Sequence, residues 1–501
     1  MKREILWIKL ADNVWYFRFK KFKDKYLITN DVGKWSFLSE DDFFVFLKWE
    51  LKDDKYDELV EKWFIIDDMK AYKDKMIQWF RKKNEFIFWW PSLHIIVTTL
   101  RCNHKCRYCH AAVASMDQKE LDMSKETAQK VVDTIFYTSN PNITIEFQWW
   151  EPLVNWEIIK FIVEYAEEKA CALKKNLKFA LVTNLTLMDE KKLDYILKHK
   201  ISISTSLDGD EQLHNYNRVF TGWNSFKEVT YWIKRINEEY KKRWIKDKWG
   251  EDFVKVWALL TVTRKTLSKY KEVIDTYVDL GLDGIFLRHL NPYGFAANQK
   301  KELGYTADEF FEFYKNSMDY ILEINKKWTK FREMLSSIYL SKILTDKDPN
   351  YLDERSPCGA CIWQVAYNYD GKIFSCDEWR MLGRMWDLSF MMTEVTDSWE
   401  ETYKSMINSE TTKIMVQAST LDWLPGYNED VYKPYIGVCP IYNYKTTWNI
   451  YPVYAKDNRR RLNERILDYL FEKLRDEENK KIFESWLWIE NNIVTSQCET
   501  I

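Results

Sequence analysis

The chain has 501 residues and a formal net charge of −2 at pH 7, which does not favour a nucleic acid or another polyanion as partner. The length allows roughly two to four domains. No apolar run is typical of a signal peptide or a membrane span, so we expect a cytoplasmic protein that binds no membrane.

Residues 1–91 are predicted to form a small N-terminal α+β domain that ends at Pro91. Runs of alternating polarity predict three strands, and amphipathic stretches predict two helices: 5–10, 14–19, 25–29, 40–50 and 68–82. An exposed sheet edge in such a domain can bind a peptide by strand addition. A peptide-binding role and simple packing against the next domain are both open readings.

Between residues 92 and 326 the pattern changes to alternating strands and helices. Six strands are predicted, at 93–100, 143–148, 178–183, 201–207, 254–262 and 284–290. Helices are predicted after each of them, at 124–137, 156–172, 189–198, 225–242, 268–280 and 307–326. This alternation predicts an α/β fold, a parallel sheet curled into a partial (β/α)6 TIM-like barrel.

The rest of the chain divides into three segments. Residues 327–355 are predicted to be a helical linker, 356–455 a loop-rich domain with four cysteines, and 456–501 a closing helical segment. The chain has nine cysteines in all. In a long intracellular chain, grouped cysteines indicate metal ligands rather than disulfides.

The first group, Cys102, Cys106 and Cys109, has the spacing C-x3-C-x2-C directly after the first barrel strand. Three thiolates hold three irons of a 4Fe–4S cluster and leave the fourth iron open to a ligand. The carboxyl end of a barrel strand is also where barrel active sites lie. The alternative is a zinc site completed by His104 or His110, although zinc sites more often pair C-x2-C twice.

The second group consists of Cys358, Cys361, Cys376 and Cys439. Asp370-Gly371 is a hairpin signal that would return Cys376 towards Cys361. Four cysteines can fully ligate one auxiliary 4Fe–4S cluster, and a zinc ribbon is the alternative. Two further cysteines, 171 and 498, stand outside both groups.

The first cysteine group, with the aromatic Tyr108 before its last cysteine, resembles the hallmark of the radical SAM superfamily. The resemblance implies a SAM-binding 4Fe–4S cluster and S-adenosyl-L-methionine (SAM). It also implies reductive cleavage of SAM to a 5′-deoxyadenosyl radical that takes a hydrogen atom from a substrate. No catalytic acid or base is assigned by it.

In this superfamily the second strand typically ends in a Gly-Gly-Glu-Pro turn against the amino group of SAM; this chain has Trp149-Trp150-Glu151-Pro152. Ser206, and Arg218 twelve residues later, resemble the pair that contacts the SAM ribose and carboxylate. These residues and Tyr108 are the expected cofactor contacts. Thr183 and Asn184 are candidates to line the cavity, and His289 is either a substrate contact or a core histidine.

The segment Cys361-x9-Gly371-x4-Cys376 resembles the start of a SPASM domain, the auxiliary-cluster domain of peptide-modifying radical SAM enzymes. The chain lacks the dense run C-x2-C-x5-C-x3-C, so one auxiliary cluster is expected. Overall the chain is most similar to the maturase of the His-Xaa-Ser peptide system. This similarity implies a precursor peptide or protein as substrate, an external electron donor such as flavodoxin or ferredoxin, and a companion radical SAM protein.

Three alternatives stay open at this point. One is an enzyme like the anaerobic sulfatase maturases, which modifies a cysteine or serine of a protein. Another is a non-catalytic, zinc-stabilised binding module. The third is a radical SAM homologue disabled by Trp149 and Trp150.

Tryptophan occurs 25 times and glycine only 13 times. Glycine makes up about 7% of an ordinary protein, and the two counts together match that share. Several tryptophans stand in turn-like segments, at 33–36, 89–91, 222–224, 385–387 and 447–449, where glycine would supply a positive φ. We therefore hypothesise that a glycine codon, with UGA the candidate, is written as tryptophan here; a genuinely tryptophan-rich protein is the alternative.

Overall fold

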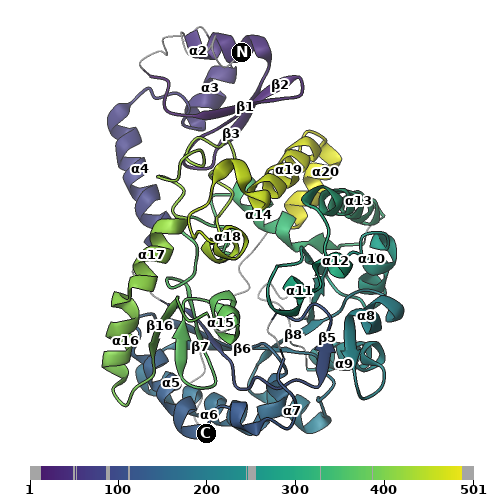
Figure 1. Cartoon of the computed structure of the whole chain (residues 1–501). Helices are drawn as coiled ribbons and strands as arrows, with labels where there is room; N and C mark the ends of the chain where they lie inside the picture. The colour runs from purple at the N-terminus through teal and green to yellow at the C-terminus, as the bar shows by residue number, and fades with distance from the viewer. Residues whose placement is uncertain are drawn as a thin grey trace.

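A nine-stranded sheet runs through the computed structural model, in the order β12-β10-β8-β7-β6-β4-β14-β15-β16 (Figure 1). The structure describes residues 13–48, 51, 54–85, 91–110, 113–243, 245, 255–327, 329–385 and 387–487. The strands of this sheet are β4 Leu93–Ile96, β6 Asn142–Phe147, β7 Asn176–Thr183, β8 Ser202–Ser206, β10 Trp257–Thr261, β12 Leu287–Arg288, β14 Gln364–Tyr367, β15 Lys372–Phe374 and β16 Met391–Glu394.

The first six of these strands in chain order, β4 to β12, are parallel, and each overlaps one of the six predicted ones. The predicted strand 284–290 is divided into β12 and a short strand of another sheet. Helices alternate with them: α5 Lys125–Tyr137, α6 Trp156–Leu173, α7 Glu190–Lys198, α8 Glu211–Asn217, α9 Ser225–Lys242, α10 Tyr270–Asp279 and α13 Ala307–Lys326. Ser124 caps α5 by accepting a hydrogen bond from the backbone N–H of Thr127. The predicted partial barrel is confirmed.

Strand β7 shows why the sheet encloses a cavity. Its residues alternate between buried and partly exposed along the whole strand. Leu177 and Leu181 belong to the core cluster under the helices, while Lys178, Ala180 and Val182 line the cavity on the other face. Phe179 belongs to the core cluster and also reaches the cavity. A half-buried strand pattern therefore marks the inner wall of the barrel.

The cysteine-rich segment extends the barrel sheet, which its loop-rich sequence did not predict. Strand β14 pairs in parallel with β4, with Gln364 opposite Leu93 and Tyr367 opposite Ile96. Because β14 has four residues and all are buried, no alternation could reveal it. The pairing brings the second cysteine group beside the first barrel strand.

Helices fill most of the C-terminal part. They are α14 Met334–Leu344 in the linker, α15 Asp377–Arg384, α16 Trp399–Asn408, α17 Glu410–Ser419, α18 Pro440–Thr447, α19 Asn458–Lys473 and α20 Glu477–Ser485. Short elements complete the fold: β5 His104–Cys106, β9 Arg218–Phe220, β11 Gly284–Ile285, β13 Arg332–Glu333, α11 Gly294–Asn298, α12 Lys300–Leu303, η2 Lys119–Leu121, η3 Pro152–Asn155 and η4 Tyr454–Lys456. Within the described ranges, no helix is long and apolar enough to cross a membrane.

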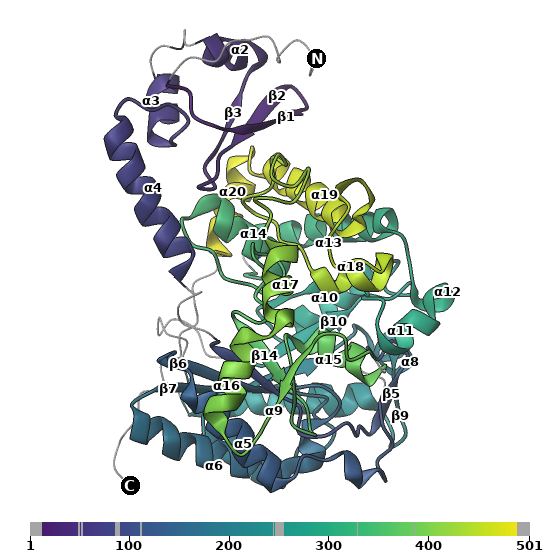
Figure 2. The ribbon, with the colours of Figure 1, turned by 60° about the vertical axis from the view of Figure 1, so that its left-hand side comes forward.

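The N-terminal region forms a small sheet, β1-β2-β3, with helices beside it (Figure 2). Its elements are β1 Arg18–Phe22, β2 Lys25–Thr29, β3 Trp35–Leu38, α2 Glu40–Lys48, α3 Asp54–Glu61 and α4 Met69–Lys83. It has its own core, in which the rings of Tyr26 and Phe43 stack 4.1 Å apart. Lys20 pairs with Glu464 and Asp468 of α19, which attaches this region to the C-terminal helices. The predicted strand 5–10 lies outside the described residues.

Candidate active site

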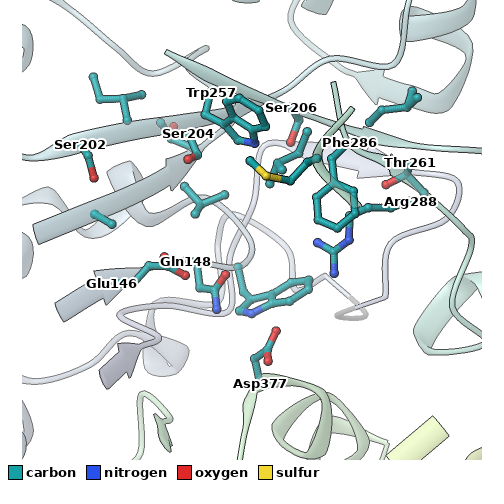
Figure 3. A pocket seen from close by; sticks show the side chains of 18 of the residues that line it. Glu146, Gln148, Ser202, Ser204, Ser206, Trp257, Thr261, Phe286, Arg288 and Asp377 are labelled. Atoms are coloured by element: carbon teal, nitrogen blue, oxygen red, sulfur yellow. The ribbon is translucent and has the colours of Figure 1, made fainter. Parts of the chain in front are cut away.

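A cavity of about 1250 Å³ lies on the inner face of the barrel sheet, and Figure 3 shows it from close by. Cys102, Cys106 and Cys109 all line it. So do side chains from the strands and from the start of α15, such as Ser206, Arg288 and Asp377. The first cysteine group therefore faces the same enclosed space as the inner wall of the barrel.

The loop that carries the three cysteines is held by backbone pairing. Strand β5 pairs with β9, and this pairing sets Cys106 opposite Arg218. The carbonyl of Cys109 accepts a 2.8 Å hydrogen bond from the backbone N–H of Phe295, at the start of α11. The middle of the cysteine motif and its last cysteine are thus anchored to two different segments, β9 and α11.

Burial raises the pKa of the Cys102 thiol well above its ordinary value and that of Cys106 to about 12. Negative charge on the neighbouring sulfurs adds to the rise, since Cys102 is affected by both Cys106 and Cys109. The three sulfurs are thus close enough to influence one another. A bound metal cluster provides the positive charge that thiolates need in such a place, so the donor set fits iron.

His104 does not serve as a further ligand in this arrangement. Its Nε2 lies 2.9 Å from the hydroxyl of Ser225 and its Nδ1 lies 3.0 Å from the amide of Asn184. Burial lowers its pKa to about 3, so the ring is neutral. His110 also lines the cavity, and its Nε2 has no hydrogen-bond partner among the described residues.

Tyr108 and Arg218 meet on one carboxylate that the sequence did not reveal. The Tyr108 hydroxyl donates to Oδ2 of Asp208 at 2.5 Å, and Arg218 donates to both oxygens of Asp208 at 3.1 and 3.3 Å. Asp208 is fully buried, whereas Tyr108 and Arg218 line the cavity. Asp208 therefore fixes both side chains at the cavity wall. In the sequence Asp208 directly follows the predicted strand 201–207 and carries no separate signal.

Glu151 lies behind the cavity wall rather than in it. Its carboxylate accepts hydrogen bonds from the Thr183 hydroxyl at 2.7 Å, from the Asn184 backbone N–H at 2.8 Å and from the Leu153 backbone N–H at 3.1 Å. Burial raises its pKa to about 7. Glu151 thereby ties the turn after β6 to the end of β7.

Trp149 and Trp150 line the cavity, and both have a left-handed backbone, with φ of 74° and 54°. Ser206, Thr183, Asn184 and His289 line the same space. All the predicted cofactor contacts except Glu151 therefore reach the cavity that holds the first cysteine group.

The second cysteine group is buried, and most of its sulfurs influence one another. Cys439 is affected electrostatically by Cys358, and Cys376 by Cys439. The backbone N–H of Cys361 donates to the carbonyl of Ser375 at 2.9 Å, which brings Cys361 beside Cys376. The Cys361 thiol, however, contacts the sulfur of Met392 at 4.0 Å.

Asp377 and Glu378, which follow Cys376, were missed by the sequence analysis. Both line the cavity, and one ligand atom each from Cys376, Asp377 and Glu378 lies within 4.8 Å of the others. Figure 3 shows Asp377 and Arg288 pointing into the cavity from different sides. Oδ1 of Asp377 is buried without a hydrogen-bond partner in the described part of the chain, so the carboxylate is available to a ligand.

Comparison with known proteins identifies the chemistry. A family model described as the Radical SAM superfamily matches residues 96–248, which contain the first cysteine group. The cysteine-type anaerobic sulfatase-maturating enzyme of Clostridium perfringens (strain ATCC 13124) is 26% identical over 320 residues, which cover 60% of this chain and 79% of that protein. This protein therefore contains a radical SAM domain.

Other proteins similar to this radical SAM enzyme include a second relative and two solved structures. The radical SAM cyclopropyl synthase TigE of Paramaledivibacter caminithermalis is 23% identical over 247 residues, 46% of this chain and 48% of TigE. Native anSMEcpe with bound AdoMet gives a TM-score of 0.61 at 18% identity, covering 78% of this chain and 100% of that one. Streptococcus suis SuiB bound to precursor peptide SuiA gives a TM-score of 0.50 at 13% identity, covering 88% of this chain and 97% of that one.

The predicted radical SAM superfamily, fold class and cofactors are therefore confirmed, while the similarity to the His-Xaa-Ser maturase stays a prediction. As a radical SAM enzyme the protein uses a 4Fe–4S cluster and SAM, which replaces the zinc reading of the first cysteine group. The two structural likenesses establish the α/β radical SAM fold, and the cysteine-rich C-terminal region fits a SPASM-type maturase with an auxiliary cluster.

Proposed function

We propose that this radical SAM enzyme modifies a ribosomally made precursor peptide, and that Cys102, Cys106 and Cys109 hold the cluster that binds SAM. When bound, the cluster and SAM supply one-electron cleavage of SAM and a radical that removes a hydrogen atom from the substrate. The observation that carries the proposal is the cavity of about 1250 Å³, with the first cysteine group lining it. Small-ligand pockets hold about 300–1,000 Å³, so this cavity has room for SAM and part of a peptide.

The chain's own residues would hold SAM in place. Asp208 orients the side chains of Tyr108 and Arg218, and Ser206 adds a hydroxyl from β8. A planar guanidinium suits the carboxylate of SAM, and a hydroxyl suits its ribose. The turn at 149–150, held by Glu151, would contact the amino group.

The second cysteine group would hold an auxiliary 4Fe–4S cluster that accepts or relays an electron. Cys358, Cys376 and Cys439 already influence one another electrostatically. Cys361 would join them by turning its thiol away from Met392, since its backbone already bonds to Ser375. An external donor such as flavodoxin or ferredoxin would reduce the first cluster.

Asp377 is the residue that we propose as proton acceptor. Removing a hydrogen atom and an electron from a substrate group also requires a base to take a proton. The Asp377 carboxylate points into the cavity, and its Oδ1 lacks a partner among described residues. It therefore has the position and, at Oδ1, the free lone pairs that a base needs, while its carboxylate also contacts the buried carboxyl of Glu378.

The N-terminal sheet is proposed to bind the peptide away from the cavity. Strand β3 lies at one edge of that sheet, where only β2 pairs with it among described strands. An extended peptide can add to such an edge through main-chain hydrogen bonds. A companion radical SAM protein is a further proposed partner.

A second candidate function is modification of a cysteine or serine in a sulfatase. The similarity to the sulfatase-maturating enzyme of Clostridium perfringens supports this function and the peptide proposal equally. The two differ in substrate and share the same site.

The deciding experiment is anaerobic reconstitution followed by incubation with SAM, dithionite and one of two peptides. One peptide carries His-Xaa-Ser repeats, and the other carries a sulfatase cysteine or serine motif. Two clusters predict about eight irons per chain. We expect a mass shift in the first peptide only, and a shift in the second alone would favour the sulfatase function.

Variants test the ligand assignment in the same assay. Cys106→Ala should abolish SAM cleavage and lower the iron content by about four. Cys376→Ala should remove about four irons and leave SAM cleavage measurable. Cys171→Ala is the matched control, because Cys171 is exposed and lies outside both groups. Unchanged iron in Cys106→Ala would refute the assignment.

A further inference from the structure

Four tryptophans have a backbone conformation that bulky residues avoid. The φ angles are 63° at Trp63, 74° at Trp149, 54° at Trp150 and 58° at Trp448. Positive φ is typical of glycine, because a Cβ is strained there. Of the ten non-glycine residues with positive φ in the described ranges, four are tryptophan, although only 25 of 501 residues are. Chance placement does not explain this excess.

Trp63 occupies a helix-ending position that glycine usually takes. After α3, the N–H of Trp63 bonds to the carbonyl of Val60 and that of Phe64 to the carbonyl of Leu59. This pair of bonds is the Schellman motif, with Trp63 at its left-handed residue. At the end of α10, Gly281 makes the same bond to Val278, and Leu282 bonds to Tyr277, with φ of 68° at Gly281.

Trp448 ends α18 in the same conformation. It is the left-handed C-cap of that helix, and its N–H bonds to the carbonyl of Tyr444 at 2.8 Å. Its side chain is 77% exposed. Its ring makes an edge contact with Tyr444 at 5.8 Å, but an exposed indole gains little from packing, so little compensates for the strained backbone here.

Trp149 and Trp150 have a strained backbone, and buried polar groups at and beside them lack hydrogen-bond partners. The indole N–H of Trp150 is buried and has no partner in the described structure. Its ring lies 4.5 Å from the guanidinium carbon of Arg380, which is 2% exposed and has an unpartnered Nε and Nη2. The Trp149 ring lies 5.7 Å from the same carbon, and both indoles line the cavity whereas Arg380 does not.

Trp35 and Trp156 have none of these features. The indole N–H of Trp35 donates to the carbonyl of Ile343 at 2.9 Å, and its ring packs against Phe471. Trp156 begins α6 with right-handed angles and packs edge-on against Tyr195. Although the sequence pattern grouped Trp35 with the turn tryptophans, it lies in strand β3.

We infer that the protein made from this gene in its own cell carries glycine at positions 63, 149, 150 and 448, with UGA read as glycine, and tryptophan at 35 and 156. Glycine at 149 and 150 removes both indoles from the cavity wall. The Arg380 guanidinium then faces the SAM-binding space as a cation for a carboxylate. The inference rests on backbone geometry and composition, so it stands whichever substrate the enzyme modifies.

The first test is peptide mass spectrometry of the protein purified from its source, together with the codons of the gene. We expect glycine encoded by UGA at 63, 149, 150 and 448, and tryptophan encoded by UGG at 35 and 156. Tryptophan in the peptides that span 149–150 would overturn the inference.

The second test compares the chain as written with Trp149→Gly/Trp150→Gly, both reconstituted. We expect SAM to bind the double variant at least about tenfold more tightly in calorimetry, and the thermal midpoint to rise. Trp156→Gly is the control, and its midpoint should fall because that indole packs against the core. A double variant with a lower midpoint and weaker SAM binding would contradict the inference, even if Trp156→Gly behaves as expected.

Discussion

Arg218 donates to both carboxylate oxygens of Asp208, at 3.1 and 3.3 Å, and Asp208 is fully buried. The same carboxylate accepts the Tyr108 hydroxyl and the backbone N–H of Thr261. One acidic side chain thus connects the cysteine loop, strand β9 and strand β10. The positions of two proposed SAM contacts depend on this single residue.

Replacing Asp208 by Asn should destabilise the protein and weaken SAM binding. The change leaves the Arg218 guanidinium without its charged partner, and breaking a buried ion pair costs about 3–5 kcal/mol. Denaturant unfolding of the apoprotein measures the loss. Asp397→Asn is the control, because Asp397 pairs with Lys130 at the surface and should change stability little. Equal losses of unfolding free energy in the two variants would show that Asp208 does not hold Tyr108 and Arg218 in place.

Glu151 should make stability depend on pH. Its pKa is raised from 4.5 to about 7 in the folded protein by burial, so the native state keeps a proton that the unfolded state loses. The free energy of unfolding contributed by this group therefore falls as pH rises from about 4.5 to about 7, and stays low above that. The total change is on the order of 3 kcal/mol.

Urea unfolding of the apoprotein between pH 4.5 and 8 tests this for Glu151→Gln. When the free energy of unfolding is plotted against pH, the variant should lack the part of the slope that Glu151 contributes. Glu157→Gln, on the exposed side of α6, should keep it. A Glu151→Gln profile parallel to the parent profile would be evidence against the raised pKa.

Trp448→Gly should stabilise the protein, although it removes a large apolar side chain. A left-handed non-glycine residue costs roughly 1–2 kcal/mol, and the exposed indole returns little of that by packing. We expect the free energy of unfolding to rise by about 1 kcal/mol. Trp423→Gly is the control: Trp423 is also exposed but lacks a positive φ and donates to Gln417, so no gain is expected. A loss of stability in Trp448→Gly would contradict the glycine assignment there.

The barrel could be predicted from sequence because each of its strands carries a local signal. Strand β7 alternates along its length, and Ser124 marks the start of α5. The first cysteine group is equally local, since three ligands lie within one loop. Such features can be recognised from the sequence without knowing which segments pack against them.

The remaining parts of the site depend on distant segments meeting. Strand β14 is too short to show a period, and only its pairing with β4 brings α15 to the cavity. Asp377 therefore looked like an ordinary residue after a cysteine. Asp208 only follows a predicted strand in the sequence, and its role becomes visible only when Tyr108 and Arg218 converge on it.

Asp377→Asn should separate SAM cleavage from product formation. Asparagine keeps the size of the side chain but cannot accept a proton at neutral pH, so we expect modification of the peptide to slow by roughly 10²–10⁴-fold. SAM cleavage under dithionite should continue, because Asp377 is not among the proposed contacts of SAM.

Both rates are measured in one anaerobic assay, with iron content as the check that Cys376, beside Asp377, still binds its cluster. Asp370→Asn, in the exposed hairpin turn, is the matched control and should change neither rate. A proportional fall in SAM cleavage and product would mean that Asp377 supports the site structurally and is not its base.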